Sequence, residues 1–402
     1  MKLPKYLNNF ISLIEKNNYQ VYVVGGAIRD YLLKIDNHDF DLTTNMPYEK
    51  IVSLCNDNHF KINTQGIKHE TIGIVLEHNY IEVTCFRGLD KSKLEQDLKL
   101  RDFTINSLAY LDNEIIDVTS GINDLNNKLL KSYNPSVTFN TDPLRILRMY
   151  RFVAKYGFDI EKNTYEIALK LKDKLKEIAV ERIQDELNKI IIYNPFILTT
   201  MAKDKILDVL FSELRINIDT DSFNNYINSY FSSSIGKKKN NIVNNFLFLL
   251  SLSHSCNIKI DVLAKFLIKK YKYSNDFSTR IKKLLNVFNY NFTSNSLDDL
   301  FYIVNNLKFD SSDLDNLFII NTAIKNDKYK NINDIKKVYL NKLKNKEVIF
   351  FSDLNISGDI IISLTNKKGK EIGDIKNLLY KECFYLITKN NLESLINRIK
   401  TI

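Results

Sequence analysis

The sequence changes character along its length, and this change limits its possible folds more than any other feature. Seven of the 11 Gly lie at or before residue 157, and all five Pro lie at or before residue 195. In this first part, runs of β-branched and aromatic residues predict strands at 21–24, 71–76, 80–84 and 115–118. Helical spacing of apolar residues occurs at 27–33 and 48–55. From about residue 142 onward the pattern is helical throughout, without further strand-like runs. The fold class that this predicts is an α/β head, a small mixed sheet with helices, followed by an all-α remainder.

A chain of 402 residues is long enough for two to four domains. We expect the α/β head at 1–135, a helical neck at 136–200, and a helical body and tail at 201–402. Within the neck, apolar periodicity predicts helices at 143–156, 165–176 and 181–192. Asn/Ser-rich stretches predict connections near 217–240, 289–298 and 327–333.

The composition excludes several classes of protein. The four Cys are far apart and form no CxxC pair, which argues against a disulfide framework or a zinc knuckle. No run of about 18 apolar residues could span a bilayer, and the first residues do not resemble a signal peptide. We therefore expect a cytoplasmic enzyme or binding protein with no membrane partner.

The excess of positive over negative charge lies entirely in the second half of the chain. Residues 1–200 contain 26 basic and 27 acidic residues, a net charge of −1, whereas residues 201–402 contain 31 and 21, a net charge of +10. Lys and Arg spread over helical surfaces would attract a polyanion such as a nucleic acid. Solvation of helix faces in a Lys-rich chain is the alternative explanation.

A Gly-Gly pair lies between the first predicted strand and the helix that follows it. Gly25 and Gly26 allow a tight turn and a close approach of the backbone to a ligand. The start of the next helix offers N–H groups and the positive end of the helix dipole, both of which favour phosphate. Arg29, in the first turns, can reach the same oxygens. A pair of glycines that only closes a turn is the alternative.

Three carboxylates could form a metal site beside this turn. Asp39 and Asp41 are two positions apart, so on a strand they would face the same side. Two close negative charges repel unless a cation lies between them, and oxygen ligands suit Mg²⁺. Glu82 adds a third acid if its strand is a neighbour, an arrangement that suits phosphoryl or nucleotidyl transfer with two metal ions. A solvated turn and the polar face of a strand are the alternatives.

These residues belong to a larger pattern that resembles the class II nucleotidyltransferases, the tRNA CCA-adding enzymes and bacterial poly(A) polymerases. The pattern consists of seven blocks in the order and spacing of the family within residues 21–190, and it thins after about residue 200. The first block contains GGAIRD and DFDLTT within 25–44. The other six are GIKHETI at 66–72, IEVTCFR at 81–87, RDFTIN at 101–106, D…G…DL at 117–125, DPLRILRMYRF at 142–152 and ERI…EL at 181–187.

The resemblance implies roles for individual residues. Asp39 and Asp41 would hold Mg²⁺, with Glu82 as the third catalytic carboxylate. The triphosphate of the nucleotide would be bound by Gly25, Gly26 and Arg29, and Arg101 and Asp102 would contact the nucleotide and its ribose.

Asp142 and Arg145 are implied to read the base. On the predicted helix they are three positions apart and would share a face. An Asp accepts from the exocyclic amine of cytosine or adenine and an Arg donates to ring acceptors, whereas guanine and uracil present a carbonyl to the Asp. Arg148 and Arg151 continue the stripe and would reach phosphate. Taken alone, this helix would suggest ordinary packing of its apolar side chains, with the arginines on the solvent-exposed face.

The resemblance also implies a reaction and its partners. The 3′-hydroxyl of a tRNA would attack the α-phosphate of CTP or ATP and release pyrophosphate, so that C, C and A are added without a nucleic-acid template. The helical body and tail would bind the acceptor arm of the tRNA.

Three features depart from the family pattern. Leu100 stands where an Arg is usual, Thr141 stands where a Glu is usual, and the loop Gly88–Gln96 has only nine residues. A short loop resembles the CC-only members, which leave the terminal A to a second enzyme. A CC-only enzyme, a poly(A) polymerase and a non-catalytic RNA-binding protein on the same scaffold are therefore the alternatives. The HETI sequence at 69–72 argues against the poly(A) polymerase, and the intact acids and base readers argue against a non-catalytic protein.

Overall fold

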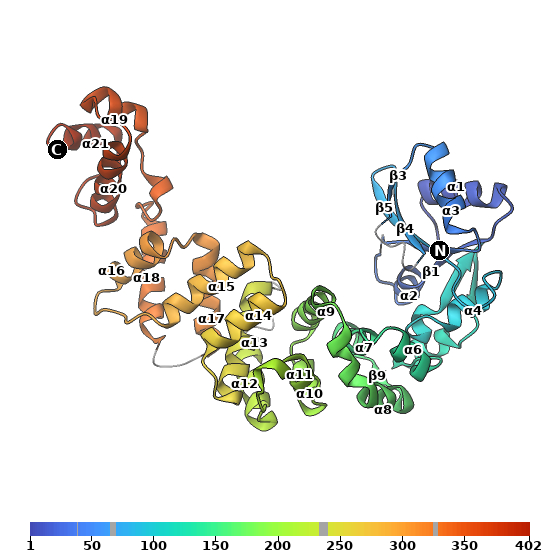
Figure 1. Ribbon diagram of the computed structural model, residues 1–402. Helices are drawn as coiled ribbons and strands as arrows, with labels where there is room; N and C mark the ends of the chain where they lie inside the picture. Colours follow the sequence, from blue (N-terminus) through green and yellow to red (C-terminus); the bar gives the residue numbers. More distant parts are fainter. Residues whose placement is uncertain (38, 65–69, 233–239, 325–328) are drawn as a thin grey trace. The chain divides into compact units, whose positions relative to one another are not determined.

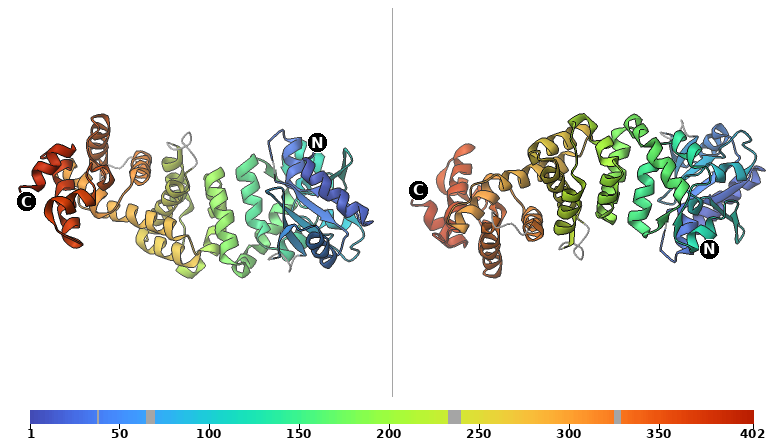
Figure 2. Two further views of the ribbon diagram at one scale, coloured as in Figure 1. Left: turned by 90° about the horizontal axis from the view of Figure 1, so that it is seen from above. Right: turned by 90° about the horizontal axis from the view of Figure 1, so that it is seen from below.

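The computed structural model describes residues 1–37, 39–64, 70–232, 240–324 and 329–402. The chain divides into two compact units: unit 1 comprises residues 1–197 and 203–215, and unit 2 comprises 198–202 and 216–402. Strands gather in the N-terminal part of the chain, and the described residues after 216 form helices without strands (Figures 1 and 2). The predicted fold class is confirmed. The limits predicted for head, neck and body remain predictions.

One sheet organises the head within unit 1. Its order is β3-β4-β5-β2-β1-β6-β7; β2 and β5 run parallel, and the other neighbours are antiparallel. The strands are β1 (Val21–Val24), β2 (Asp41–Thr44), β3 (Lys61–Asn63), β4 (Thr71–Leu76), β5 (Asn79–Cys85), β6 (Leu108–Leu111) and β7 (Glu114–Asp117). The four strands predicted from the sequence are confirmed as β1, β4, β5 and β7.

Alternation along β2 and β5 places their apolar and acidic side chains on opposite faces of the sheet. Leu42 and Val83 are buried in the core of the head, which also contains side chains of α1, α2 and α3. Asp41 and Glu82, their neighbours along the same strands, therefore point to the opposite face. The helices of the head are α1 (Lys5–Lys16), α2 (Gly26–Leu32), α3 (Tyr48–Asp57), α4 (Leu94–Lys99) and α5 (Gly121–Asn126), with a 3₁₀ turn η2 (Thr104–Asn106).

A close contact between α5 and η2 fixes the segment that carries part of the site. A Cβ atom on Gly121 would lie 2.1 Å from the carbonyl oxygen of Thr104, so only glycine fits there. The hydroxyl of Thr104 donates to Asp124 of α5 over 2.7 Å. The carboxylate of Asp117 accepts the backbone N–H groups of Gly121 and Ile122 and so holds the start of α5.

The helices of the neck region follow; they lie in unit 1 except for residues 198–202, which belong to unit 2. They are α6 (Pro135–Thr141), α7 (Arg145–Tyr156), α8 (Lys162–Leu171), η3 (Lys172–Glu177) and α9 (Val180–Tyr193), then α10 (Ile197–Lys203), α11 (Ile206–Leu210) and η4 (Ser212–Leu214). Helix α7 packs against α9 and ends at Gly157, whose φ of +68° suits a glycine after a helix. A short parallel pair, β8 (Leu129–Leu130) and β9 (Asp159–Ile160), interrupts the helices.

The prediction that Asp142 lies on the same helix as Arg145 is wrong. Asp142 has an extended backbone, with φ −144° and ψ 94°, and α7 begins only at Arg145. The physical reason is Pro143, because the ring of a proline disfavours the helical conformation of the residue before it.

Unit 2 is a set of packed helices. They are α12 (Thr220–Ser232), α13 (Asn241–Cys256), α14 (Ile260–Lys270), α15 (Asn275–Phe288), α16 (Ser296–Phe301), η5 (Tyr302–Asn306), α17 (Ser311–Ile324), α18 (Asn331–Lys344), η7 (Phe351–Asp353), α19 (Gly358–Thr365), α20 (Lys370–Phe384) and α21 (Leu392–Ile399). Helix α13 is apolar on most sides because it packs against α12, α14, α15 and α17. The predicted connection at 217–240 was wrong in part, since it contains α12, whose Phe223 and Ile227 are buried.

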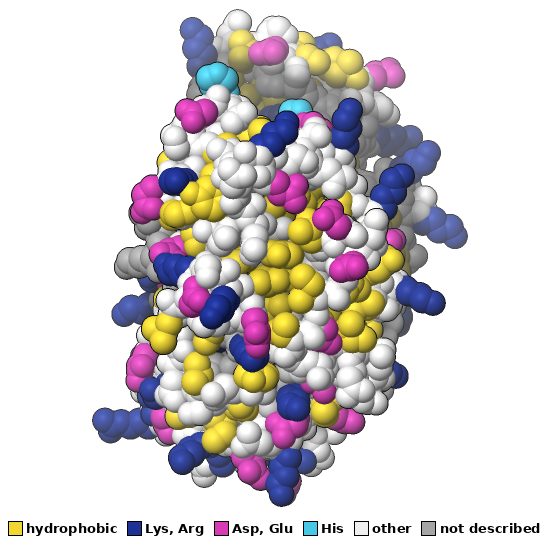
Figure 3. Space-filling view, turned by 90° about the vertical axis from the view of Figure 1, so that its right-hand side faces the viewer, with side chains coloured by type: hydrophobic (Ala, Val, Ile, Leu, Met, Phe, Trp, Pro, Cys, Tyr) yellow, Lys and Arg dark blue, Asp and Glu magenta, His cyan; other side chains and the backbone are white. Residues whose placement is uncertain are grey.

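The surfaces agree with the charge pattern of the sequence. Figure 3 looks onto unit 1, and on this face Lys and Arg side chains are interspersed with Asp and Glu around hydrophobic side chains. Such mixing fits the net charge of −1 of residues 1–200. None of the helices formed by the described residues has the length and apolar character needed to cross a membrane.

We expect Gly121→Ala to destabilise the protein by about 3 kcal/mol, because the added methyl group meets backbone rather than a movable side chain. Gly373→Ala in α20 is the matched control: its Cβ would meet nothing within 4 Å, and the exchange should change stability by less than about 1 kcal/mol. Chemical unfolding followed by circular dichroism measures both. A wild-type unfolding midpoint for Gly121→Ala would contradict the contact with Thr104.

Candidate active site

A pocket of about 580 Å³ in unit 1 brings together every site residue predicted from the sequence. Its lining includes the predicted catalytic residues Asp39, Asp41 and Glu82. It also includes the residues predicted to bind the nucleotide, which are Gly25, Gly26, Arg29, Arg101, Asp102, Asp142, Arg145, Arg148 and Arg151. Residues separated by more than 100 positions in the sequence therefore share one cavity.

The three acids form one corner of this pocket. Asp41 and Glu82 are direct partners in the parallel pair of β2 and β5, so the prediction that their strands are neighbours is confirmed. Asp39 lies just before β2, which begins at Asp41, so the expectation that both aspartates lie within one strand is wrong. Burial and the negative charges of Asp39 and Glu82 raise the pKa of Asp41 to about 6.

The acid corner suits a hard cation. Burial and two neighbouring carboxylates disfavour the charged form of Asp41, and a bound divalent cation would favour it. Among the described residues, no group of three or more His, Cys, Asp or Glu side chains is arranged to hold a metal ion by itself. Mg²⁺ is often held by one or two carboxylates together with substrate phosphates and water, and Asp39 and Asp41 fit that pattern.

A glycine turn forms the second corner. Gly25 has a φ of +75°, its N–H donates to the carbonyl of Leu108, and α2 starts at Gly26. A Cβ atom on Gly25 would lie 3.7 Å from Nη1 of Arg101 and 4.0 Å from Oδ2 of Asp41. The turn therefore places backbone, a guanidinium and a carboxylate within a few ångströms of one another.

Arg29 lies deeper than the sequence suggests. It is only 6% exposed, and its guanidinium lies over the rings of Phe152 and Tyr156. It also donates to the carboxylate of Asp30 and, over 2.6 Å, to Oδ1 of Asn106. Arg29 therefore contributes to the pocket a positive charge whose position next to the glycine turn is fixed by these contacts.

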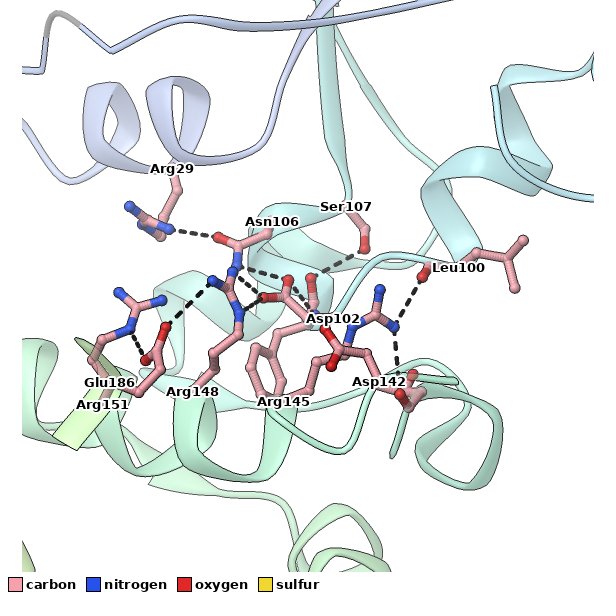
Figure 4. A network of polar contacts seen from close by, with 12 residues as sticks. Arg29, Leu100, Asp102, Asn106, Ser107, Asp142, Arg145, Arg148, Arg151 and Glu186 are labelled. Carbon is pink, nitrogen blue, oxygen red and sulfur yellow. Dashed lines mark hydrogen bonds and ion pairs between the residues drawn. The ribbon is translucent and has the colours of Figure 1, made fainter. Parts of the chain in front are cut away.

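Asp102 is the centre of the polar network in Figure 4. Its Oδ2 accepts from Nε and Nη2 of Arg148 at 2.9 and 2.6 Å, and its Oδ1 accepts from the side-chain amide of Asn106 at 2.9 Å. Burial by itself would raise the pKa of Asp102, but Arg148 and Arg145 hold it far below its usual value. Asp102 is therefore charged, and it links the head to α7.

The residues expected to read the base lie where α6, α7 and α9 meet. Asp142 pairs with Arg182 of α9, whose Nη2 lies 2.8 Å from its Oδ2. Arg145 donates through Nη1 to the backbone carbonyl of Leu100 over 3.2 Å. Because this contact uses the backbone of Leu100, it does not depend on an Arg side chain at that position.

Arg148 and Arg151 extend from the same face of α7 as Arg145, as the three-residue spacing predicts. Nε of Arg151 donates to Glu186 over 2.6 Å, and its guanidinium lies 4.4 Å from the centroid of the Phe152 ring. Glu186 also lies 3.8 Å from Arg148. The carboxylate of one buried residue on α9 thus orients two arginines of α7.

The pocket also contains residues that the prediction omitted. They are Asp30, Ile35, Asp36, Asn37, Arg87, Asn106, Phe152, Lys155 and Arg182. Arg87, Asn106 and Arg182 stand inside blocks that carried the family resemblance, so the blocks themselves were the available signal. Of the block at 66–72, residues 66–69 lie outside the described part of the chain.

We expect Asp102→Asn to cost about 2 to 4 kcal/mol of stability at pH 7, because it leaves the charge of Arg148 without its partner. A carboxyl group with a depressed folded pKa adds stability above its unfolded pKa, about 3.9, and loses it as the pH falls toward the folded pKa. The stability gap between wild type and Asp102→Asn should therefore be full above about pH 5 and narrow below about pH 4.

Urea unfolding at a series of pH values measures this gap. Asp185→Asn on α9, where the carboxylate is 60% exposed and pairs with Lys189, is the control and should stay within about 0.5 kcal/mol of wild type. A gap that is independent of pH would contradict the charged state of Asp102.

Two family models match within the first 216 residues of the chain. The model described as "Poly A polymerase head domain" matches residues 21–131, and the one described as "Probable RNA and SrmB- binding site of polymerase A" matches residues 157–216. The first match covers the sheet with its acid and glycine corners. The second begins at the end of α7.

Curated relatives include a CC-adding tRNA nucleotidyltransferase of Halalkalibacterium halodurans, 37% identical over 185 residues. That match covers 46% of this chain and 48% of the relative, and the chain spans only about half the length of most of the relatives that it resembles best. A CCA-adding enzyme of Streptococcus suis is 31% identical over 319 residues, which cover 71% of this chain and 72% of that enzyme.

Among solved structures, the Bacillus stearothermophilus CCA-adding enzyme in complex with CTP has a similar fold. The TM-score is 0.69 at 19% identity, with 99% of this chain and 98% of that chain covered. The Thermotoga maritima CCA-adding enzyme complexed with tRNA gives a TM-score of 0.63 at 22% identity, with 100% and 96% covered. From the extended match to the Streptococcus suis enzyme and from the shared blocks, the chain belongs to the class II nucleotidyltransferase family of the CCA-adding enzymes and bacterial poly(A) polymerases.

Proposed function

We propose that the chain is a tRNA nucleotidyltransferase that adds C, C and A to the 3′ end of tRNA from CTP and ATP without a nucleic-acid template. The observation that carries this proposal is the single pocket that joins the acid corner, the glycine turn and the pair Asp142 and Arg145. Metal-binding acids alone would suit many phosphoryl transfers. Base-reading side chains in the same cavity favour a reaction that selects its nucleotide.

The acid corner would bind the cofactor. Asp39 and Asp41 would hold divalent cations, for which Mg²⁺ is our proposal, with Glu82 beside them. When bound, such cations lower the pKa of an attacking hydroxyl and offset the charge on a leaving phosphate. The negative charges of Asp39 and Glu82 beside Asp41 support a role for these acids as ligands of a cation.

The glycine turn and the arginines would bind the triphosphate. Arg101 is close enough to Gly25 to contact a phosphate placed over the turn. Arg29, held behind the turn, adds positive charge that favours the leaving pyrophosphate. Positioned this way, the α-phosphate would face the acid corner, where the 3′-hydroxyl of the RNA attacks it and pyrophosphate leaves.

Asp142 and Arg145 would select the base. The carboxylate of Asp142 is an acceptor and can take the amine of cytosine or adenine, whereas the guanidinium of Arg145 can donate to a ring acceptor. Arg182 already contacts both oxygens of Asp142, which orients the carboxylate. An RNA partner is supported by the net charge of +10 on residues 201–402, which suits phosphate contacts of low sequence specificity.

A CC-only enzyme is the second candidate, and the short segment Gly88–Gln96 favours it. The expectation that all nine residues form a loop is wrong, because the last three belong to α4. The loop is closed by its own contacts: the N–H of Asp90 donates to Oε1 of Gln96, and a Cβ atom on Gly88 would lie 2.6 Å from that oxygen. One of the relatives named above is a CC-adding enzyme and another is a CCA-adding enzyme.

The deciding experiment incubates the protein with tRNA that ends at the discriminator base, with CTP and ATP together and singly, and sequences the 3′ ends. Ends in CCA support the proposal, and ends in CC with both nucleotides present support the CC-only enzyme. Runs of A would indicate a poly(A) polymerase. Unaltered ends together with tRNA binding would indicate a non-catalytic RNA-binding protein.

Asp41→Asn should lower nucleotide addition by at least about a thousandfold while tRNA affinity stays within about threefold, because the acid corner serves the chemistry and not RNA binding. Incorporation of labelled CTP and filter binding of tRNA measure the two effects. Asp112→Asn, in the exposed turn between β6 and β7, is the control and should retain full activity. Near-normal turnover in Asp41→Asn would remove the basis of the metal assignment.

Asp142→Ala should reduce the preference for CTP over UTP by about 10- to 100-fold, since a good side-chain pair to a base edge is worth roughly 1–3 kcal/mol of discrimination. Kinetics with all four nucleotides measure this preference. Thr141→Ala changes the exposed neighbour, whose hydroxyl donates to the carbonyl of Val137, and should keep wild-type selectivity. If Asp142→Ala also keeps it, other residues read the base.

A further inference from the structure

Asp97 is a buried carboxylate beside the pocket to which the proposed reaction assigns no role. It lies on α4, next to Gln96, and has no solvent exposure. A buried carboxylate is costly unless hydrogen bonds and an opposite charge compensate it. Its partners therefore indicate what it holds in place.

The main partner of Asp97 is Arg101. Oδ2 of Asp97 accepts from Nε of Arg101 at 3.1 Å and from Nη2 at 2.9 Å. Two N–H groups of one guanidinium directed at a single carboxylate fix both the position and the orientation of the planar group. The side chain of Arg101 is only 11% exposed, so it has little freedom to turn elsewhere.

The remaining nitrogen of that guanidinium points to the glycine turn. Nη1 of Arg101 lies 3.7 Å from the place that a Cβ atom on Gly25 would occupy. Because Nε and Nη2 are bound to Asp97, the direction of Nη1 follows from the position of that carboxylate. Without Asp97 the long Arg101 side chain would have several rotamers available.

Asp97 also contacts the strand that carries the catalytic acid. The hydroxyl of Thr43, on β2 two residues after Asp41, donates to Oδ2 of Asp97 over 3.2 Å. The N–H of Arg87 donates to Oδ1 over 3.3 Å. The carboxylate of Asp97 therefore links the guanidinium of Arg101 to β2, the strand that also carries Asp41.

We propose that Asp97 is a positioning residue: it orients the guanidinium of Arg101 against the Gly25 turn, so that Arg101 contacts the triphosphate of the incoming nucleotide. The proposal rests on the proposed function for the nature of the ligand, a nucleoside triphosphate. It adds that the affinity for this ligand depends on a residue that does not touch it.

A double-mutant cycle of Asp97→Asn and Arg101→Ala tests this dependence, with the dissociation constant of CTP measured by calorimetry in the presence of Mg²⁺ and the absence of tRNA. Asp97→Asn should weaken CTP about tenfold in the wild-type background, because loss of a hydrogen bond between charged groups costs about one to two orders of magnitude. In the Arg101→Ala background the same change should weaken CTP by less than about twofold. The KM for CTP should follow the dissociation constant, with kcat within about twofold of wild type.

Glu95→Gln is the matched control, since Glu95 lies on the same helix, is 59% exposed and pairs with Lys99; its CTP affinity should equal that of wild type. Circular dichroism checks the fold of each variant. If Asp97→Asn does not fold, Asp97→Glu, which keeps the charge but displaces it by one methylene, replaces it in the same cycle with the same expectation.

An equal loss of CTP affinity in both backgrounds, or no loss in either, would overturn the positioning role. This outcome can be separated from a failure of the proposed function. If wild type binds CTP and the cycle is non-additive but no nucleotide is transferred to tRNA, then the proposed reaction is wrong and the role of Asp97 stands. If wild type transfers nucleotides and the cycle is additive, only the role of Asp97 is wrong.

Discussion

The carboxylate of Asp102 lies between the sheet of the head and helix α7, and the shape of the pocket depends on how it is paired. Arg148 reaches it from α7 and Asn106 from η2, and Asn106 in turn accepts from Arg29 behind the glycine turn. The orientation of the amide follows from these partners, because an arginine only donates and a carboxylate only accepts. One chain of polar contacts therefore joins the glycine corner to the helix that carries the arginines.

The same principle recurs around the pocket. Three of its arginines are each held by a buried carboxylate: Arg101 by Asp97, Arg151 by Glu186 and Arg29 by Asp30. Buried partners reduce the freedom of these arginines, and a preorganised set of positive groups binds phosphate at a lower entropic cost. The acid corner is the exception. There, Asp41 has acidic neighbours and a raised pKa, which leaves it suited to a bound cation.

Local sequence patterns predicted much of the fold, and the family resemblance implied most of the residues of the candidate site. Runs of β-branched and aromatic residues predicted the strands at 21–24 and 71–76, and the three-residue spacing of Arg145, Arg148 and Arg151 predicted one face of α7. Prediction from the sequence failed where a neighbour changed the backbone, as Pro143 does for Asp142. It also could not find partners such as Asp97 and Arg182, since nothing in the spacing indicates which distant side chain a buried charge will meet.

The central claim is that one pocket binds the triphosphate at the glycine turn and reads the base with side chains. A structure of the protein with CTP and Mg²⁺ tests it most directly. The account predicts phosphate oxygens within hydrogen-bonding distance of Arg101 near Gly25, and the amine of cytosine facing Asp142. It would be contradicted by a CTP whose phosphates lie at the turn while its base lies away from both Asp142 and Arg145.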